Sequence, residues 1–148
     1  MSPRLQEEIR DTLRAVFQDM QQHIATLVQA LEDERVALDE SDSRALDQAG
    51  TRKQAIMRQL EQLDAERQQL VAQLSDSGAT LEPEWKQLLG TLRECQQSNL
   101  RNGHTVGQRL LQVRRALSIL TGHTGNTPIY GQTGALHINL QSRVFAEV

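Results

Sequence analysis

The sequence predicts an all-α protein: an elongated antiparallel three-helix bundle with coiled-coil packing and a flexible C-terminal arm. Its composition is typical of long helices, because 38% of the residues are hydrophobic while 3% are aromatic and three are prolines. Apolar residues recur every three or four positions through three long stretches, which is the spacing of one helix face. The links between these stretches are short, so consecutive helices should pack side by side and antiparallel.

The first helix is expected over residues 3–38. Ser2 can cap its N-terminus, and Pro3 suits the first helical position, where its missing N–H would have no helical partner. The apolar stripe stops near Leu38, and residues 39–43 are polar and turn-like. The stripe consists of Leu5, Ile9, Leu13, Val16, Met20, Ile24, Leu27 and Leu31.

The second helix is expected over residues 43–74, with Asp42 or Ser43 as its cap. Two charged residues, Lys53 and Arg67, stand on its stripe. Their aliphatic stems are expected to cover apolar surface while their charges reach water. The apolar members of the stripe are Leu46, Ala49, Ile56, Leu60, Leu63, Leu70 and Leu74.

The third helix is expected over residues 83–121, beginning near Pro83 and ending before Gly122. The middle of its stripe is polar and rich in glycine. We interpret its asparagines as setting the register of the bundle and its glycines as allowing close approach of a neighbouring helix. A docking surface is the alternative. The four positions are Asn99, Asn102, Gly103 and Gly107.

The chain is expected to divide into a bundle over residues 1–122 and an arm over residues 123–148. Its charge divides in a similar way. Residues 1–94 carry 11 basic and 18 acidic side chains, a net charge of −7, whereas the rest carry 5 and 1, a net charge of +4. Such a split indicates a partner for the second part of the chain.

The arm has apolar anchors but no single structural pattern, since part of it alternates like a strand and part has helical spacing. Such a segment can become ordered against a partner. The alternative is that it folds back and covers the bundle. The candidate partner-binding residues are Tyr130, Gly131, Gly134, Leu136, Ile138, Leu140, Val144 and Phe145.

Catalysis and metal binding have little support, so we expect no enzyme, no cofactor and no metal site. The histidines are scattered, with no pair at the i, i+4 spacing of a helical zinc site. Carboxylates such as those of residues 32–34 are expected on solvated helix faces, and Cys95 is expected to be a small buried hydrophobe. The histidines are His23, His104, His123 and His137.

We expect a cytoplasmic protein without stable membrane insertion. No apolar run approaches the ~20 residues of a membrane span, and the N-terminus does not resemble a signal peptide. Arg114 and Arg115 stand near a helix C-terminus, where they complement the helix dipole. Because no set of aromatic residues for base stacking accompanies them, we expect no nucleic-acid partner.

Three segments carry a resemblance to a known family. Residues 99–103 (NLRNG), 109–120 (RLLQVRRALSIL) and 130–134 (YGQTG) resemble the FlgN family of flagellar export chaperones. Residues 34–38 (ERVAL) and Lys53 are similar to that family as well. The resemblance covers nearly the whole chain, and its most specific part is the final third.

The resemblance implies a cytosolic chaperone for hook-associated proteins of the FlgK and FlgL type. Such a chaperone binds the terminal helical segments of its cargo, keeps the cargo unpolymerised and delivers it to the flagellar type III secretion apparatus. The family binds cargo through its C-terminal region, which corresponds here to residues 130–148, either alone or together with the adjoining part of the third helix.

Two other functions fit an all-α chain. One is a coiled-coil scaffold or oligomerisation module without cargo, and the short links leave both a monomer and a homodimer open. The other is a histidine phosphotransfer domain with His104 as the candidate site. That function is disfavoured because the expected Lys-Gly does not follow His104.

Overall fold

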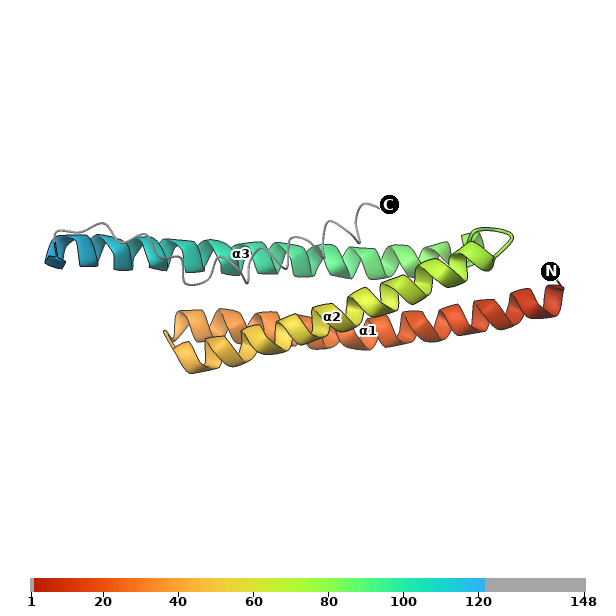
Figure 1. Ribbon diagram of the computed structural model, residues 1–148, viewed down its shortest axis with the longest axis horizontal. Helices are drawn as coiled ribbons and strands as arrows, with labels where there is room; N and C mark the ends of the chain where they lie inside the picture. The colour runs from red at the N-terminus through yellow and green to blue at the C-terminus, as the bar shows by residue number, and fades with distance from the viewer. Residues whose placement is uncertain (1, 122–148) are drawn as a thin grey trace.

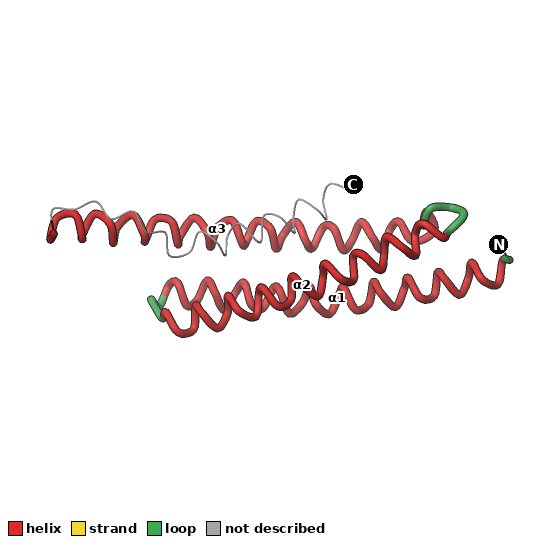
Figure 2. Tube along the Cα trace, in the orientation of Figure 1, coloured by secondary structure: helices red, strands yellow, loops and turns green. Residues whose placement is uncertain are grey.

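The computed structural model describes residues 2–121 as a bundle of long helices (Figures 1 and 2). Helix α1 covers Pro3–Asp39, α2 covers Ser43–Gln73 and α3 covers Glu82–Thr121, with a 3₁₀ helix, η1, at Ala79–Leu81. The described part of the chain contains no strand. The all-α class expected from the sequence is confirmed, and each helix begins and ends within one residue of the expected range.

The three helices run up, down and up along one long axis. Helices α1 and α2 form an antiparallel hairpin, and α3 returns alongside α1 (Figure 1). The last turns of α3 extend past the turn that joins α1 to α2 (Figure 1). Because α1 packs against both other helices, it is the central element of the bundle.

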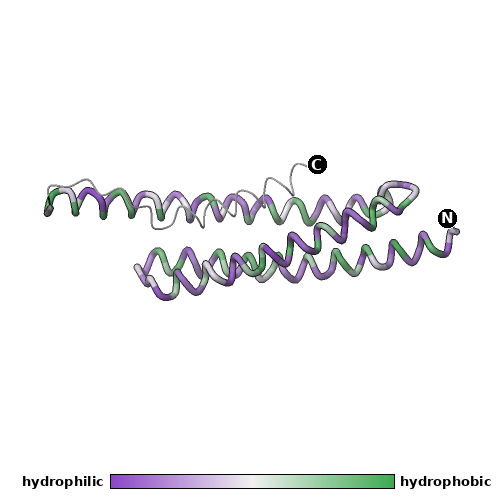
Figure 3. The backbone as a smooth tube through the Cα atoms, in the orientation of Figure 1, coloured by the Kyte–Doolittle hydropathy of each residue, from purple (hydrophilic) through white to green (hydrophobic). Residues whose placement is uncertain are grey.

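The core is a continuous apolar cluster between the helices. Along each helix, apolar residues alternate with polar ones, as the colouring of Figure 3 shows. Each buried leucine stabilises the fold by about 2 kcal/mol. The larger apolar side chains of the cluster are Ile9, Leu13, Phe17, Met20, Ile24, Leu27, Leu31, Ile56, Met57, Leu60, Leu74, Leu81, Trp85, Leu88 and Leu89.

Side-chain caps fix where α1 and α2 begin. The Ser2 hydroxyl oxygen accepts a hydrogen bond from the Leu5 N–H at 3.2 Å, and Asp42 Oδ1 accepts one from the Ala45 N–H at 3.1 Å. Pro3 occupies the first turn of α1. Of the two caps that the sequence allowed for α2, the structure uses Asp42. Each cap satisfies a backbone donor that has no partner within the helix.

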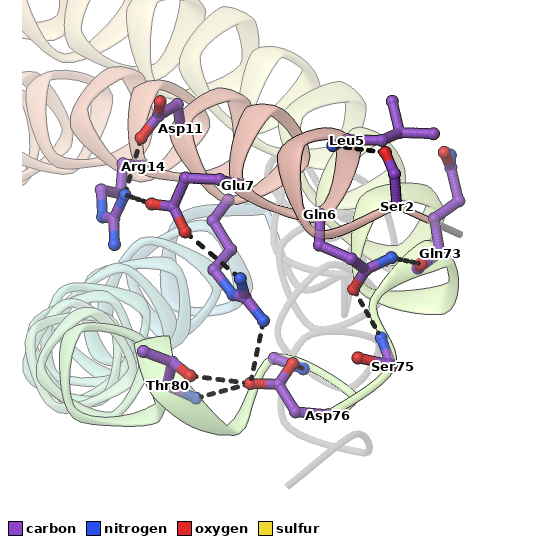
Figure 4. Close-up of polar contacts among 12 residues, drawn as sticks. Ser2, Leu5, Gln6, Glu7, Asp11, Arg14, Gln73, Ser75, Asp76 and Thr80 are labelled. Atoms are coloured by element: carbon purple, nitrogen blue, oxygen red, sulfur yellow. Dashed lines mark hydrogen bonds and ion pairs between the residues drawn. The ribbon is translucent and has the colours of Figure 1, made fainter.

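The link between α2 and α3 is anchored to the start of α1 (Figure 4). Gln6 Nε2 donates to the Gln73 carbonyl oxygen at 3.1 Å, and the Ser75 N–H donates to Gln6 Oε1 at 2.9 Å. Asp76 accepts hydrogen bonds from the Thr80 hydroxyl and the Gly78 N–H, which hold its pKa below the ordinary value. These contacts close the end of the bundle that carries the N-terminus.

Arg67 differs from the expectation that its charge reaches water. The side chain is buried, with a residue exposure of 7%. Its Nε lies 2.8 Å from Asp64 Oδ1, and its guanidinium stacks 4.0 Å above the ring of Trp85, which itself stacks on Phe17. A planar guanidinium that pairs with a carboxylate and covers an aromatic ring can be buried. The sequence pattern could not predict this, because the partners lie on other turns and helices.

The backbone conformation at position 78 should require a glycine. Its φ is +79°, in the left-handed region, and an added Cβ would lie 3.4 Å from Val71 Cγ2. The substitution Gly78→Ala is therefore expected to lower the free energy of unfolding by about 1–2 kcal/mol. Gly50 is the matched control, because it lies inside α2 and an added Cβ there would meet no atom within 4 Å outside the neighbouring backbone of its own helix. Gly50→Ala is expected to raise the free energy by about 0.5–1 kcal/mol.

Urea unfolding followed by circular dichroism measures both changes. If Gly78→Ala were as stable as Gly50→Ala, this account of the turn would be wrong.

Candidate functional site

The sequence places its functional candidates in two regions, the arm and the middle of α3. The arm residues, from Tyr130 to Phe145, lie outside the residues that the structure describes, so their role stays a prediction. Asn99, Asn102, Gly103 and Gly107 lie within α3. The structure brings the two asparagines together with charged side chains from the other helices.

A polar layer, made of Glu34, Lys53, Asn99 and Asn102, crosses the bundle. Glu34, Lys53 and Asn102 are buried, and Asn99 is half-buried. Lys53 Nζ from α2 lies 2.7 Å from Glu34 Oε2 of α1 and donates a hydrogen bond of 2.9 Å to Asn99 Oδ1 of α3. Asn102 Nδ2 donates to Glu34 Oε1 at 2.9 Å and to the Leu31 carbonyl oxygen at 3.0 Å. One side chain from each of α1 and α2 and two from α3 thus form a single hydrogen-bonded network.

Each charge in the polar layer is balanced by a partner. Lys53 has an exposure of only 4%, and Glu34 is buried as well. Both carboxylate oxygens of Glu34 accept hydrogen bonds, and the Lys53 ammonium has two acceptors. The expectations that Lys53 reaches water and that Glu34 lies on a solvated face are wrong. The physical reason is that burial of a charge is tolerated when an opposite charge and further hydrogen bonds accompany it.

The expected role of the glycines in close packing is not supported. An added Cβ at Gly103 or Gly107 would meet no atom within 4 Å outside its own helix backbone. No neighbouring helix therefore requires a glycine at either position. Their physical effect is local, since each glycine weakens a helix by about 1 kcal/mol relative to alanine.

The polar layer also marks where the burial of α3 ends. Asn102 is buried, and no residue from 103 to 120 is. Large apolar side chains along the rest of α3 are exposed, including Val113 at 52% and Leu120 at 81%. Helix α3 thus has a first half that packs in the bundle and a second half whose apolar side chains are accessible.

Cys95 lies in the first half of α3 as a buried thiol, in accordance with the sequence. Burial, and secondarily the charge of Glu94, raises the pKa of the Cys95 thiol to about 11. The thiol is therefore protonated at neutral pH and is a poor nucleophile. Within residues 2–121 no three His, Cys, Asp or Glu side chains are placed to hold a metal ion.

A long helical bundle with a polar layer across its core and an accessible apolar helix end is suited to binding other polypeptides. The family model described as "FlgN protein" matches residues 6–138. The chain therefore belongs to the FlgN family, and the resemblance seen in the sequence is confirmed. This family consists of flagellar export chaperones and is not known to contain enzymes.

No curated protein and no solved structure gives a significant match to the sequence. Among the described helices, none is long and apolar enough to span a membrane. As a FlgN-family member, the chain has a general role as a chaperone in flagellum assembly that binds export substrates.

The buried ion pair of the polar layer should tolerate loss of one partner poorly. Lys53→Met leaves the Glu34 carboxylate buried without its counter-charge, so the free energy of unfolding should fall by about 3–5 kcal/mol. Arg52→Met is the matched control, because Arg52 forms a 2.7 Å ion pair with Asp33 between the same two helices but on the exposed surface. The free energy of unfolding of Arg52→Met should fall by less than about 1 kcal/mol.

Denaturant unfolding measures both variants. The double variant Glu34→Met/Lys53→Met should recover much of the loss. Equal effects of Lys53→Met and Arg52→Met would contradict the burial of the polar layer.

The Cys95 thiol should make stability depend on pH in the alkaline range. Its pKa is about 11 in the folded chain against an ordinary value of 9.0, so the unfolded chain loses this proton first as the pH rises. The stabilisation is complete below pH 9.0 and is lost as the pH rises towards about 11. The variant Cys95→Ala, compared with the unchanged chain at each pH, isolates this part of the pH dependence.

The same burial predicts that a thiol reagent modifies the native chain far more slowly than the urea-unfolded chain. Equal rates in the two states would show that Cys95 is accessible.

Proposed function

We propose that the chain is a cytoplasmic chaperone for hook-associated proteins of the FlgK and FlgL type. It binds their terminal helical segments, keeps them unpolymerised and delivers them to the flagellar type III secretion apparatus. The observation that carries this proposal is the extent of the family match, which runs from residue 6 through the bundle and past the end of α3 to residue 138. The first part of the arm, residues 123–138, therefore lies within the family match.

Cargo binding is assigned in this proposal to the arm, residues 123–148, with Tyr130, Gly131 and Gly134 at its turn. Its apolar anchors, Leu136, Ile138, Leu140, Val144 and Phe145, lie within a segment, from Cys95 to Ala146, that contains no acidic residue. A chain segment with apolar anchors that gains order on binding can cover a partner helix. The arm lies outside the described residues, so the support for this assignment is the sequence and, up to residue 138, the family match.

The polar layer serves, in the same proposal, to hold the bundle in one register. A buried asparagine at a coiled-coil seam disfavours helix alignments that would leave its amide without a partner. Asn99 and Asn102 reach Lys53 and Glu34, and a shift of α3 by one turn along α1 would separate them. Gly103 and Gly107 follow this layer directly and lower the helix propensity of the next two turns.

A coiled-coil scaffold without cargo is the second candidate, favoured by the accessible apolar side chains of α3. It would pair between copies of the chain. Light scattering over a concentration series separates the two functions, because a scaffold stays oligomeric on dilution whereas a bundle chaperone dissociates to a monomer or is one throughout.

Calorimetric titration of the full chain with the C-terminal segment of a hook-associated protein tests the proposal. We expect saturable binding, weakened at least about tenfold, roughly 1.4 kcal/mol, when Leu140 and Val144 are both changed to Asp. The physical reason is that charged side chains cannot enter an apolar interface without a counter-charge.

The matched control changes the neighbouring polar residues Asn139 and Ser142 to Ala, and its affinity should be unchanged. Absence of binding by the full chain would refute the assignment for that cargo. Equal binding by the Leu140→Asp/Val144→Asp variant would move the site from the arm to the bundle.

A further inference from the structure

The second half of α3 carries an apolar stripe at coiled-coil spacing. Its members are three or four residues apart, which places them within one narrow face of the helix. Their side chains run from half-buried beside the α1–α2 turn to exposed at the end of α3. We call this face the α3 end stripe. It consists of Val106, Leu110, Val113, Leu117 and Leu120.

The α3 end stripe begins in a groove beside the α1–α2 turn. The groove has a volume of about 270 Å³ and is lined by Ala37, Leu38 and Leu46 on one side and by Val106, Leu110 and Val113 on the other. Because these lining side chains are apolar, the groove can receive apolar side chains of a partner helix. Beyond Val113, α3 extends about 12 Å further at 1.5 Å per residue.

The charges beside the stripe are all positive. At 100° per residue, Arg109 and Arg114 lie on opposite flanks of the stripe. From Cys95 to Thr121 α3 contains no acidic residue. The carboxylate in the groove lining, Asp42, is engaged as the cap of α2, and Arg109 Nη1 donates to the Ser41 hydroxyl at 3.0 Å across the groove. A partner with carboxylates on both sides of an apolar stripe would match this arrangement.

The same charges disfavour the two occupants that the chain itself could supply. In a parallel, in-register dimer formed through the stripe, Arg109 of one copy would face Arg114 of the other, and in an antiparallel dimer neither copy would offer a carboxylate to balance the flanking arginines. Like charges at these positions oppose pairing. The arm, residues 123–148, contains one acidic residue, Glu147, and one arginine, Arg143, so it cannot supply carboxylates on both sides of a helix.

We propose that the α3 end stripe and its groove bind an amphipathic helix of another protein, with an apolar stripe flanked on both sides by Asp or Glu. The proposal rests on the proposed function in that this helix belongs to an export substrate. It goes beyond that function because it assigns a second contact, on the described bundle, with its own charge preference. Apolar side chains of the partner enter the groove, and its carboxylates face Arg109 and Arg114.

Two designed peptides test the charge preference. Both have three heptads with leucine at the a and d positions, and the flanking positions are Glu in one and Lys in the other. Fluorescence anisotropy with the full chain at low salt should show that the Glu peptide binds at least about tenfold more tightly than the Lys peptide. This preference should shrink at high salt, where exposed charges are screened.

Substitutions on α3 locate the site. Arg109→Glu/Arg114→Glu should reverse the preference between the peptides. Val113→Glu should weaken the Glu peptide at least about tenfold, because it adds a like charge to the apolar stripe. Ile119→Glu is the matched control, because Ile119 is 83% exposed and lies on the opposite side of the helix. The affinity of this variant for the Glu peptide should stay within about twofold of that of the unchanged chain. Circular dichroism checks that each variant is folded.

Equal binding of the two peptides, no binding of either, or equal effects of Val113→Glu and Ile119→Glu would overturn the proposal. A dimer of the unchanged chain that Val113→Glu dissociates would assign the stripe to a second copy instead and would also overturn it.

Titration of the same variants with the C-terminal segment of a hook-associated protein separates this proposal from the proposed function. If the Val113→Glu variant binds cargo as tightly as the unchanged chain does, the second contact on α3 is refuted and the chaperone assignment is not. If the chain binds the Glu peptide selectively but does not bind the cargo segment, the chaperone assignment is refuted for that cargo and the preference of the α3 end stripe for an acidic helix is not.

Discussion

Three helices with repeating leucine stripes can pack at several alignments, because leucine packs against leucine in much the same way when one helix slides by a heptad. The hydrogen bonds of Lys53 with Glu34 and Asn99, and of Asn102 with Glu34, cannot slide in this way. A shifted alignment would bury these groups without partners, which is costly in an apolar interior. The polar layer is therefore the constraint on which the alignment of α3 with the hairpin depends in our account.

The alignment in turn decides which part of α3 is available to other molecules. On the N-terminal side of the polar layer, α3 packs on the core through Trp85, Leu88 and Leu89. Beyond it, the hairpin soon ends at Ser41 and Asp42, while α3 continues to Thr121 (Figure 1). A longer hairpin or an α3 shifted towards its own N-terminus would cover Val113 and its neighbours. The bundle thus presents an accessible apolar helix end next to the point where the arm begins.

The sequence predicted the elements well because their signals are local. Periodic leucines, the caps at Ser2 and Asp42 and the proline at Pro83 act within a few residues of where they stand, and the helix bounds expected from them agree with the structure to within a residue. The unusual polarity at Asn99 and Asn102 was also visible. What could not be predicted was the partners of these asparagines, because a single sequence does not state which turns of two helices lie side by side.

The same limit explains the errors at Lys53, Glu34 and Arg67. Each was expected to place its charge in water, since isolated charges are rarely buried, and each is instead buried beside an opposite charge from another turn or helix. The sequence shows only that a charged residue stands on an apolar stripe. Such a residue can either extend its charge to water or be buried beside an opposite charge. The interpretation of Gly103 and Gly107 as close-packing positions is not supported, because the space beside them is open.

The central claim, that the polar layer fixes the alignment of α3, is tested most directly by a distance measurement. Spin labels at the exposed positions Gln22 and Gln112, in a Cys95→Ala background, report how far α3 lies along α1. The chain with its polar layer should give one narrow distance distribution. A variant with Glu34→Met, Lys53→Met, Asn99→Leu and Asn102→Leu should give a broad or split distribution, displaced by about 10 Å for a slide of one heptad. The same single narrow distance in that variant would contradict the account.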